Sequence, residues 1–146
     1  MKFNTRMRYG LRCMIEIALA DESKGILQKE ISQNQNISRK YLDQIIGALK
    51  SSRMIDNSGG RGSGYKLGKE AGDRSVYDIY RSFESELKVV DELNDDCVAD
   101  NSCAAREYWQ DLNRHITEHM QSVTLKDLKE RQIYFSQQKI EMDYTI

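Results

Sequence analysis

Apolar residues recur at steps of three and four along the first fifty residues of the chain. One stretch, 5–20, has the period of an amphipathic helix, and a second stretch has the same period over 39–50. Ser38 stands directly before the second stretch, where its hydroxyl is expected to accept a hydrogen bond from a free backbone N–H. A shorter helix is expected between them, over 28–34, followed by a two-residue turn. The pattern predicts a helix–turn–helix unit.

Glycine dominates the segment that follows these helices. Residues 57–64 include four glycines, pack poorly into a core and are expected to form a loop. Short strands are expected on either side. The first starts at Met54 and Ile55, and the second covers 65–67, where apolar and polar residues alternate. A helix–turn–helix followed by a glycine-rich hairpin is the order of a winged-helix DNA-binding domain. An ordinary hairpin is the alternative, and a nucleotide-binding phosphate loop is a weaker one, because the lysine-then-hydroxyl ending is missing.

The side of the second helix that points away from its apolar stripe is polar and net basic, which suits a reader of the major groove. Gln44 is suited to paired hydrogen bonds with adenine, and Asp43 to accepting one from cytosine. The glycine-rich loop adds groups for phosphate or minor-groove contact. The residues expected to touch DNA are Ser38, Arg39, Lys40, Tyr41, Asp43, Gln44, Lys50, Arg61, Ser63, Tyr65 and Lys66.

The formal net charge of −1 conceals an asymmetry between the two halves of the chain. Residues 1–70 hold 13 Lys and Arg against 7 Asp and Glu, a net charge of +6, whereas residues 71–146 hold 9 against 16, a net charge of −7. An anionic duplex is steered to the first half, with chance clustering of solvated charges as the alternative. The chain has neither an apolar run that would span a membrane nor a secretory signal, so we expect a cytoplasmic protein with no membrane partner.

The second half of the chain is also predicted to be helical. Ser75 is expected to cap a helix that ends near Phe83. A long helix over 104–123 then carries an apolar seam of near-heptad spacing, and it has no obvious partner within the chain. We therefore expect it to pair with a second copy, and packing within one chain is the alternative, above all for the tryptophan. The seam consists of Ala105, Trp109, Leu112, Ile116, Met120 and Val123.

The predicted fold is mostly α with a small β wing: a winged helix–turn–helix domain plus a long C-terminal dimerisation helix. Thr124 and Asp127 are expected to start a short helix after the long one. The expected divisions are a DNA-binding domain over 1–83, a cysteine-containing connection over 84–103, the dimerisation helix with the short helix over 104–130, and a frayed polar tail over 131–146.

Several short motifs follow one another in a fixed order along nearly the whole chain. They are Arg8-Tyr9-Gly10-Leu11-Arg12, Ile37-Ser38, Tyr41-Leu42-Asp43-Gln44, Gly64-Tyr65-Lys66-Leu67, Cys103, Trp109 and Val123-Thr124-Leu125. This ordered set resembles the Rrf2 family of bacterial winged-helix regulators, of the IscR, NsrR and CymR type. The resemblance implies a homodimer that binds a near-palindromic operator in double-stranded DNA and represses or activates transcription.

The resemblance also implies, for many family members, an iron–sulfur cluster held by three cysteines. Cys97 and Cys103 match the last two of these positions, but Asp91 stands at the first and Arg106 stands where a histidine is usual. Carboxylate ligation of such clusters is rare, and the neighbouring acids disfavour both an anionic cluster and a reactive thiolate. We therefore predict no cofactor. A [2Fe-2S] cluster completed by Asp91 or by a partner subunit, and a redox-active thiol pair with DNA binding as its output, are the alternatives.

His115 and His119 form an H-x-x-E-H motif of the kind found in inverted zinc proteases, and their spacing places both on one helical face. The same helix carries the apolar seam, and only 27 residues follow to supply a third ligand. The sequence therefore favours a protein that is not an enzyme, with a metal-dependent hydrolase as the remote alternative.

Overall fold

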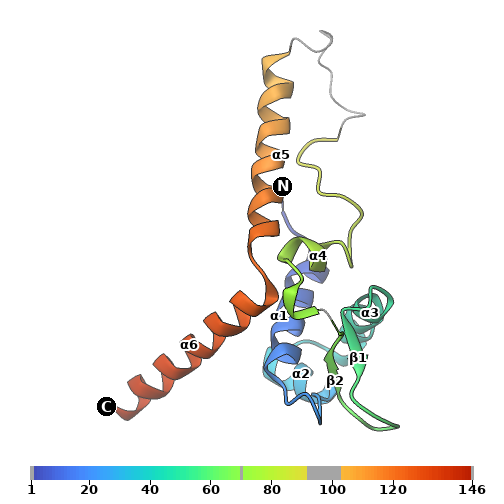
Figure 1. Ribbon diagram of the computed structural model, residues 1–146, viewed down its shortest axis with the longest axis vertical. Helices are drawn as coiled ribbons and strands as arrows, with labels where there is room; N and C mark the ends of the chain where they lie inside the picture. The colour runs from blue at the N-terminus through green and yellow to red at the C-terminus, as the bar shows by residue number, and fades with distance from the viewer. Residues whose placement is uncertain (1, 70, 92–102, 146) are drawn as a thin grey trace.

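The structure is a computed structural model, which describes residues 2–69, 71–91 and 103–145. Helices α1 to α4 and a two-stranded sheet form one body, and two long helices, α5 and α6, extend from it in different directions (Figure 1). The predicted class, mostly α with a small β wing, is confirmed.

Helix α1 (Thr5–Leu19) lies at the centre of the body. Its N-cap, Asn4, accepts a hydrogen bond of 2.8 Å from the backbone N–H of Met7. Gly10 lets the helix approach Phe83 closely, since a Cβ at this position would lie 2.4 Å from the phenylalanine ring. The buried face of α1 carries Met7, Gly10, Cys13, Met14, Ile17 and Ala18.

The predicted helix–turn–helix is present. Helix α2 (Gln28–Gln35) ends at Asn36, whose left-handed backbone (φ 52°) turns the chain toward α3 (Arg39–Ser51). Ser38 caps α3 as expected, because its side chain accepts a hydrogen bond of 3.1 Å from the backbone N–H of Tyr41. The buried residues of α3 are those of the predicted stripe, Leu42, Ile45, Ile46 and Leu49.

The wing is an antiparallel pair of three-residue strands, β1 (Ile55–Asn57) and β2 (Tyr65–Leu67), with Asp56 opposite Lys66. The strand predicted over 65–67 is present as β2, and all three of its side chains are half-buried in this narrow sheet. A further chain segment borders β2: Ile26 and Tyr65 exchange backbone hydrogen bonds of 2.9 and 2.8 Å. This bridge joins the wing to the residues that precede α2.

Helix α4 (Val76–Tyr80) follows the short 3-10 helix η1 (Ala71–Asp73) and is shorter than predicted, because the chain continues to Phe83 in tight turns. Its predicted start is confirmed. The Ser75 hydroxyl accepts a hydrogen bond from the backbone N–H of Asp78, and the Asp78 carboxylate accepts one of 2.9 Å from the backbone N–H of Ser75.

The C-terminal part consists of α5 (Ala104–Ser122) and α6 (Leu125–Tyr144). The expectation of a short last helix and a frayed tail is wrong, because α6 has 20 residues and continues almost to the end of the chain. The capping box of Thr124 and Asp127 starts this helix, and no glycine or proline interrupts it. Its weak periodicity has a simple cause: most of its length is exposed, so no single apolar face is required.

The hydrophobic core lies between α1, α3, β1 and α4, and Met120 and Leu125 close it from the junction of α5 and α6. Within the described part of the chain, no helix is both long enough and apolar enough to cross a membrane.

Candidate nucleic-acid interface

The exposed side of α3 presents five of the residues predicted to contact DNA, Arg39, Lys40, Asp43, Gln44 and Lys50. They remain exposed because the opposite side of the helix is fully used by the core. Gly47 lies on the same side, where a Cβ would meet nothing within 4 Å, so it leaves open space at the middle of the helix. The face therefore combines cationic groups, an amide and one carboxylate, which suits hydrogen bonding to phosphates and base edges.

Tyr41 differs from the other predicted contact residues on α3 because it is half-buried. Its ring packs edge-on against Tyr9 of α1, with 5.6 Å between the ring centroids, and the Arg12 guanidinium lies 5.1 Å from the centre of the Tyr9 ring. Arg12 also donates from Nε to the side chain of Gln35 at the end of α2 (2.8 Å). These contacts fix the start of α3 against α1 and α2. The only sequence signal for them is the motif that contains Tyr9 and Arg12.

Gln28, the first residue of α2, was not identified from the sequence as part of this surface. Its side-chain nitrogen donates to the carboxylate of Asp43 (2.7 Å) and to the backbone carbonyl of Arg39 (3.1 Å). The two contacts join residues that are fifteen and eleven positions apart, so no local sequence pattern predicts them.

The wing loop is ordered by a hydrogen bond within the loop and by another to the segment that precedes α2. Gly59 donates from its backbone to the hydroxyl of Ser63 (3.1 Å), and the Ser58 hydroxyl donates to the backbone carbonyl of Lys24 (2.8 Å). Ser63 therefore shapes the loop, whereas Arg61 is exposed and available for contact.

The base of the wing touches α3. The ammonium group of Lys50 lies 5.8 Å from the centre of the Tyr65 ring, and Lys66 is half-buried beside its strand partner Asp56. The structure thus brings α3 and the wing together as one surface that carries all the predicted DNA-contact residues, although Tyr41, Ser63, Tyr65 and Lys66 contribute less exposed area.

Comparison with known proteins agrees with this geometry. Residues 3–131 match the model of a protein family described as "Rrf2: Iron-dependent Transcriptional regulator". The chain belongs to the Rrf2 family. Its predicted membership is confirmed, and by family it is a helix–turn–helix transcriptional regulator that binds DNA.

Relatives with known names support the same assignment. The Rrf2 chain is 27% identical over 133 residues to the HTH-type transcriptional regulator IscR of Klebsiella pneumoniae, a match that covers 90% of this chain and 82% of the relative. Its fold is similar to that of CymR (YrzC), the global cysteine regulator of B. subtilis, with a TM-score of 0.76 and 31% identity over 90% of this chain and 98% of that one. The oxidized form of Staphylococcus aureus CymR is also similar, with a TM-score of 0.71 and 30% identity over 89% and 97% of the two chains.

The cysteine region of this Rrf2 chain lies at the start of α5. Cys103, the residue before the helix, is half-buried and disulfide-bonded, and Asp91 is exposed. Cys97 lies outside the described residues. Among the residues that are described, no group of three His, Cys, Asp or Glu side chains is arranged to hold a metal ion. With its sulfur in a disulfide, Cys103 offers no thiolate in this oxidised state, so the described residues do not assemble the ligand set of an iron–sulfur cluster.

The third cysteine, Cys13, is a free thiol in the core of the protein. Burial, and secondarily the nearby charge of Glu16, raises the pKa of this thiol to about 12. It therefore stays protonated and serves as a small apolar side chain.

The two histidines of the H-x-x-E-H motif are exposed on α5. The Nε2 atom of His115 lies 3.3 Å from a carboxylate oxygen of Asp111 on the same helix. Within the described ranges, no group of three His, Cys, Asp or Glu side chains that includes these histidines is arranged to hold a metal ion, so the described residues offer the hydrolase alternative no metal site.

The exposure of the predicted seam residues decreases from the N-terminal to the C-terminal end of α5. Trp109 is 42% exposed and Ala105 is exposed, whereas Ile116 packs against the core and Met120 is only 7% exposed. The prediction that Met120 belongs to an intermolecular seam is wrong, because the C-terminal end of α5 closes the core of its own chain. Half-buried Leu112 and Val123 lie between these extremes.

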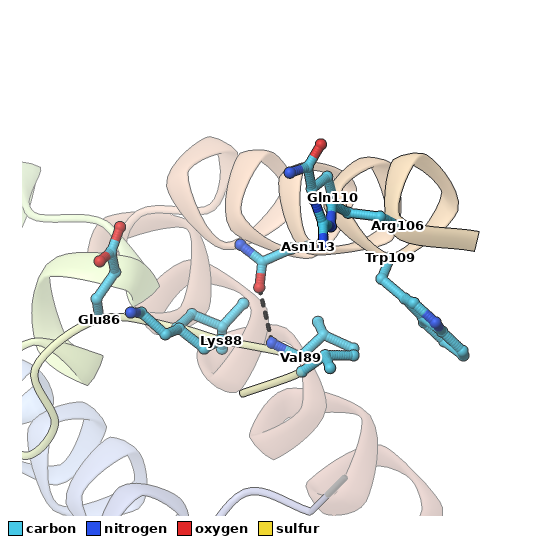
Figure 2. A pocket seen from close by; sticks show the side chains of 9 residues that line it. Glu86, Lys88, Val89, Arg106, Trp109, Gln110 and Asn113 are labelled. Atoms are coloured by element: carbon cyan, nitrogen blue, oxygen red, sulfur yellow. Dashed lines mark hydrogen bonds between the residues drawn. The ribbon is translucent and has the colours of Figure 1, made fainter. Parts of the chain in front are cut away.

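The exposed N-terminal half of α5 is held to the connection that follows α4. Val89 donates from its backbone to the side chain of Asn113 (2.8 Å), as Figure 2 shows. Trp109, on the same helix, lines the pocket between α5 and this connection together with Val89 and Asn113. The connection thus covers one side of α5, and Trp109 borders it while remaining 42% exposed.

Proposed function

We propose that this Rrf2 chain acts as a homodimer that reads a near-palindromic operator, inserting α3 into the major groove and placing the wing on the adjacent backbone or minor groove. The observation that carries the proposal is the exposed polar side of α3, with the base of the wing against its C-terminal end. The net charge of +6 in residues 1–70 supports it, because it favours the approach of an anionic duplex.

The distribution of exposed apolar side chains supports the homodimer. Of the twelve large hydrophobic residues that are exposed among the described residues, eight lie on α5 and α6: Tyr108, Trp109, Ile133, Tyr134, Phe135, Ile140, Met142 and Tyr144. Clusters of this kind mark surfaces that are covered in an assembly. A two-fold axis would place two copies of α3 on successive major-groove turns of a palindromic site.

Selection of bound duplexes from a randomised pool, followed by sequencing, tests this proposal. The expected product is an inverted repeat whose half-sites lie about one helical turn apart, or a multiple of it. Recovery of single half-sites, or of no enriched sequence, would contradict the dimeric reading of an operator.

A second proposal, favoured by the disulfide at Cys103, is that Cys97 and Cys103 form a redox pair whose state changes the affinity for the operator. A dithiol reductant would supply two electrons and two protons, break the disulfide and leave two thiols. Operator affinity is then expected to differ between oxidised and reduced protein, and a Cys103→Ser variant should show no such difference. Equal affinity of both wild-type forms would contradict this proposal and leave the DNA-binding proposal intact.

A further inference from the structure

Gln28 and Asp43 form a contact between α2 and the exposed side of α3. The Gln28 nitrogen carries two hydrogens, and two acceptors lie within reach: Asp43 Oδ1 at 2.7 Å and the Arg39 carbonyl at 3.1 Å. Because both partners can only accept, the orientation of the amide is determined: its nitrogen, not its oxygen, faces α3.

The backbone that carries this amide is fixed. Gln28 is the first residue of α2, and the backbone N–H of the preceding Leu27 donates to the carboxylate of Glu30 (2.8 Å), which holds the start of this helix. Gln28 is half-buried, whereas Asp43 is exposed. A half-buried donor at an ordered helix start therefore binds one oxygen of an exposed carboxylate, which has no other hydrogen bond within the described residues.

The second oxygen of Asp43, Oδ2, accepts no hydrogen bond from the residues that the structure describes. In the major groove an ionised carboxylate gains a hydrogen bond only from the amino groups of cytosine and adenine, and it is repelled by the acceptors of guanine and thymine. A freely rotating aspartate avoids that repulsion by turning away. An aspartate with one oxygen already hydrogen-bonded cannot turn away in this manner, so it discriminates more strongly between bases.

We propose that Gln28 is a positioning residue for operator selection: it fixes Asp43 so that Oδ2 selects a base with an exocyclic amino group. This inference rests on the proposed function, because it requires α3 to lie in the major groove. It adds a residue from outside the recognition helix to the determinants of sequence preference.

Gln28→Met tests the inference, because it keeps the length of the side chain and removes both donors. Gln33→Met is the matched control, since Gln33 is exposed on the same helix and makes no hydrogen bond within the described part of the chain. Each protein is given the same randomised duplex pool, and the base preference at every position is obtained by sequencing the bound fraction. Thermal unfolding of each variant shows whether it is folded.

The expected result is a loss of about tenfold in the preference for cytosine or adenine at one position of each half-site, equivalent to ~1.4 kcal/mol. Other positions, and affinity for random duplex, should stay within about twofold. Gln28→Glu, which has the same shape but carries no donor when ionised, should lose the same preference and also bind all duplexes more weakly. In an Asp43→Ala background, Gln28→Met should have no further effect.

Unchanged base preference in folded Gln28→Met and Gln28→Glu proteins would overturn this inference, as would an equal loss of preference at all positions. Either result leaves the proposed function standing, provided that wild-type protein enriches an operator. Failure of the wild-type protein to enrich any sequence would overturn the proposed function, and this inference with it.

Discussion

Ser75 and Thr124, the N-caps of α4 and α6, pair with each other in a short antiparallel bridge. Backbone hydrogen bonds of 2.8 and 2.9 Å join their flanking residues. Each cap also forms a capping box with an aspartate three residues later. The bridge therefore connects the last helix of the DNA-binding body to the junction of α5 and α6, and gives the two parts of the molecule a direct mechanical connection.

The capping box of Thr124 and Asp127 makes the stability of the protein depend on pH. Hydrogen bonds from the backbone N–H and then from the hydroxyl of Thr124 lower the pKa of this carboxyl below its ordinary value. Because the pKa is lower in the folded state, the stabilising contribution is present above the unfolded value of about 3.9 and is lost as the pH falls through the folded value. Asp127→Asn should therefore lower the melting temperature at pH 7, with a difference from wild type that shrinks in acid.

Circular dichroism melting curves recorded from about pH 2 to about pH 7 measure this effect. Asp56→Asn is the control, since Asp56 is exposed on β1 and its carboxylate accepts no hydrogen bond within the described ranges. A difference between Asp127→Asn and wild type that stays constant across the range would contradict the assignment.

The close approach of the wing to the start of α2 gives a second prediction. A Cβ on Gly64 would lie 2.6 Å from the backbone nitrogen of Ile26, so Gly64→Ala must push apart the bridge between Ile26 and Tyr65. We expect a destabilisation of about 1–3 kcal/mol in urea unfolding. Gly60→Ala is the matched control in the same loop, because its Cβ meets nothing within 4 Å. Equal unfolding midpoints for the two variants would show that the bridge contributes nothing.

The proposed dimer is tested best at Trp109. Ile116 lies partly in the core of its own chain, so a charge there disturbs folding as well as assembly. Trp109→Glu instead places the charge at an exposed site and should give folded monomers in sedimentation equilibrium, with weakened operator binding. Gln121→Glu, an exposed change on the same helix, should remain dimeric. If Trp109→Glu protein sediments like wild type, this half of α5 is not the dimer interface.

The sequence predicted those features that depend on near neighbours. Ser38 and Ser75 were identifiable as caps because each one satisfies a backbone N–H three residues away. The contact of Gln28 with Asp43 was not predictable, because it joins two helices and has no periodic signature. The length of α6 was missed for the opposite reason: a helix that is exposed over most of its surface needs no apolar stripe, and periodicity then underestimates it.

The central claim, that α3 reads base edges, is tested most directly by comparing Gln44→Ala with Lys40→Ala in operator binding over a range of salt concentrations. Both residues are exposed on α3. Gln44→Ala should lose about 1–3 kcal/mol on the selected operator and little on random duplex, because paired hydrogen bonds to adenine are specific to sequence. Lys40→Ala should weaken binding to all duplexes together and flatten the salt dependence, as expected for a phosphate contact. Equal losses on operator and random duplex for Gln44→Ala would contradict the account.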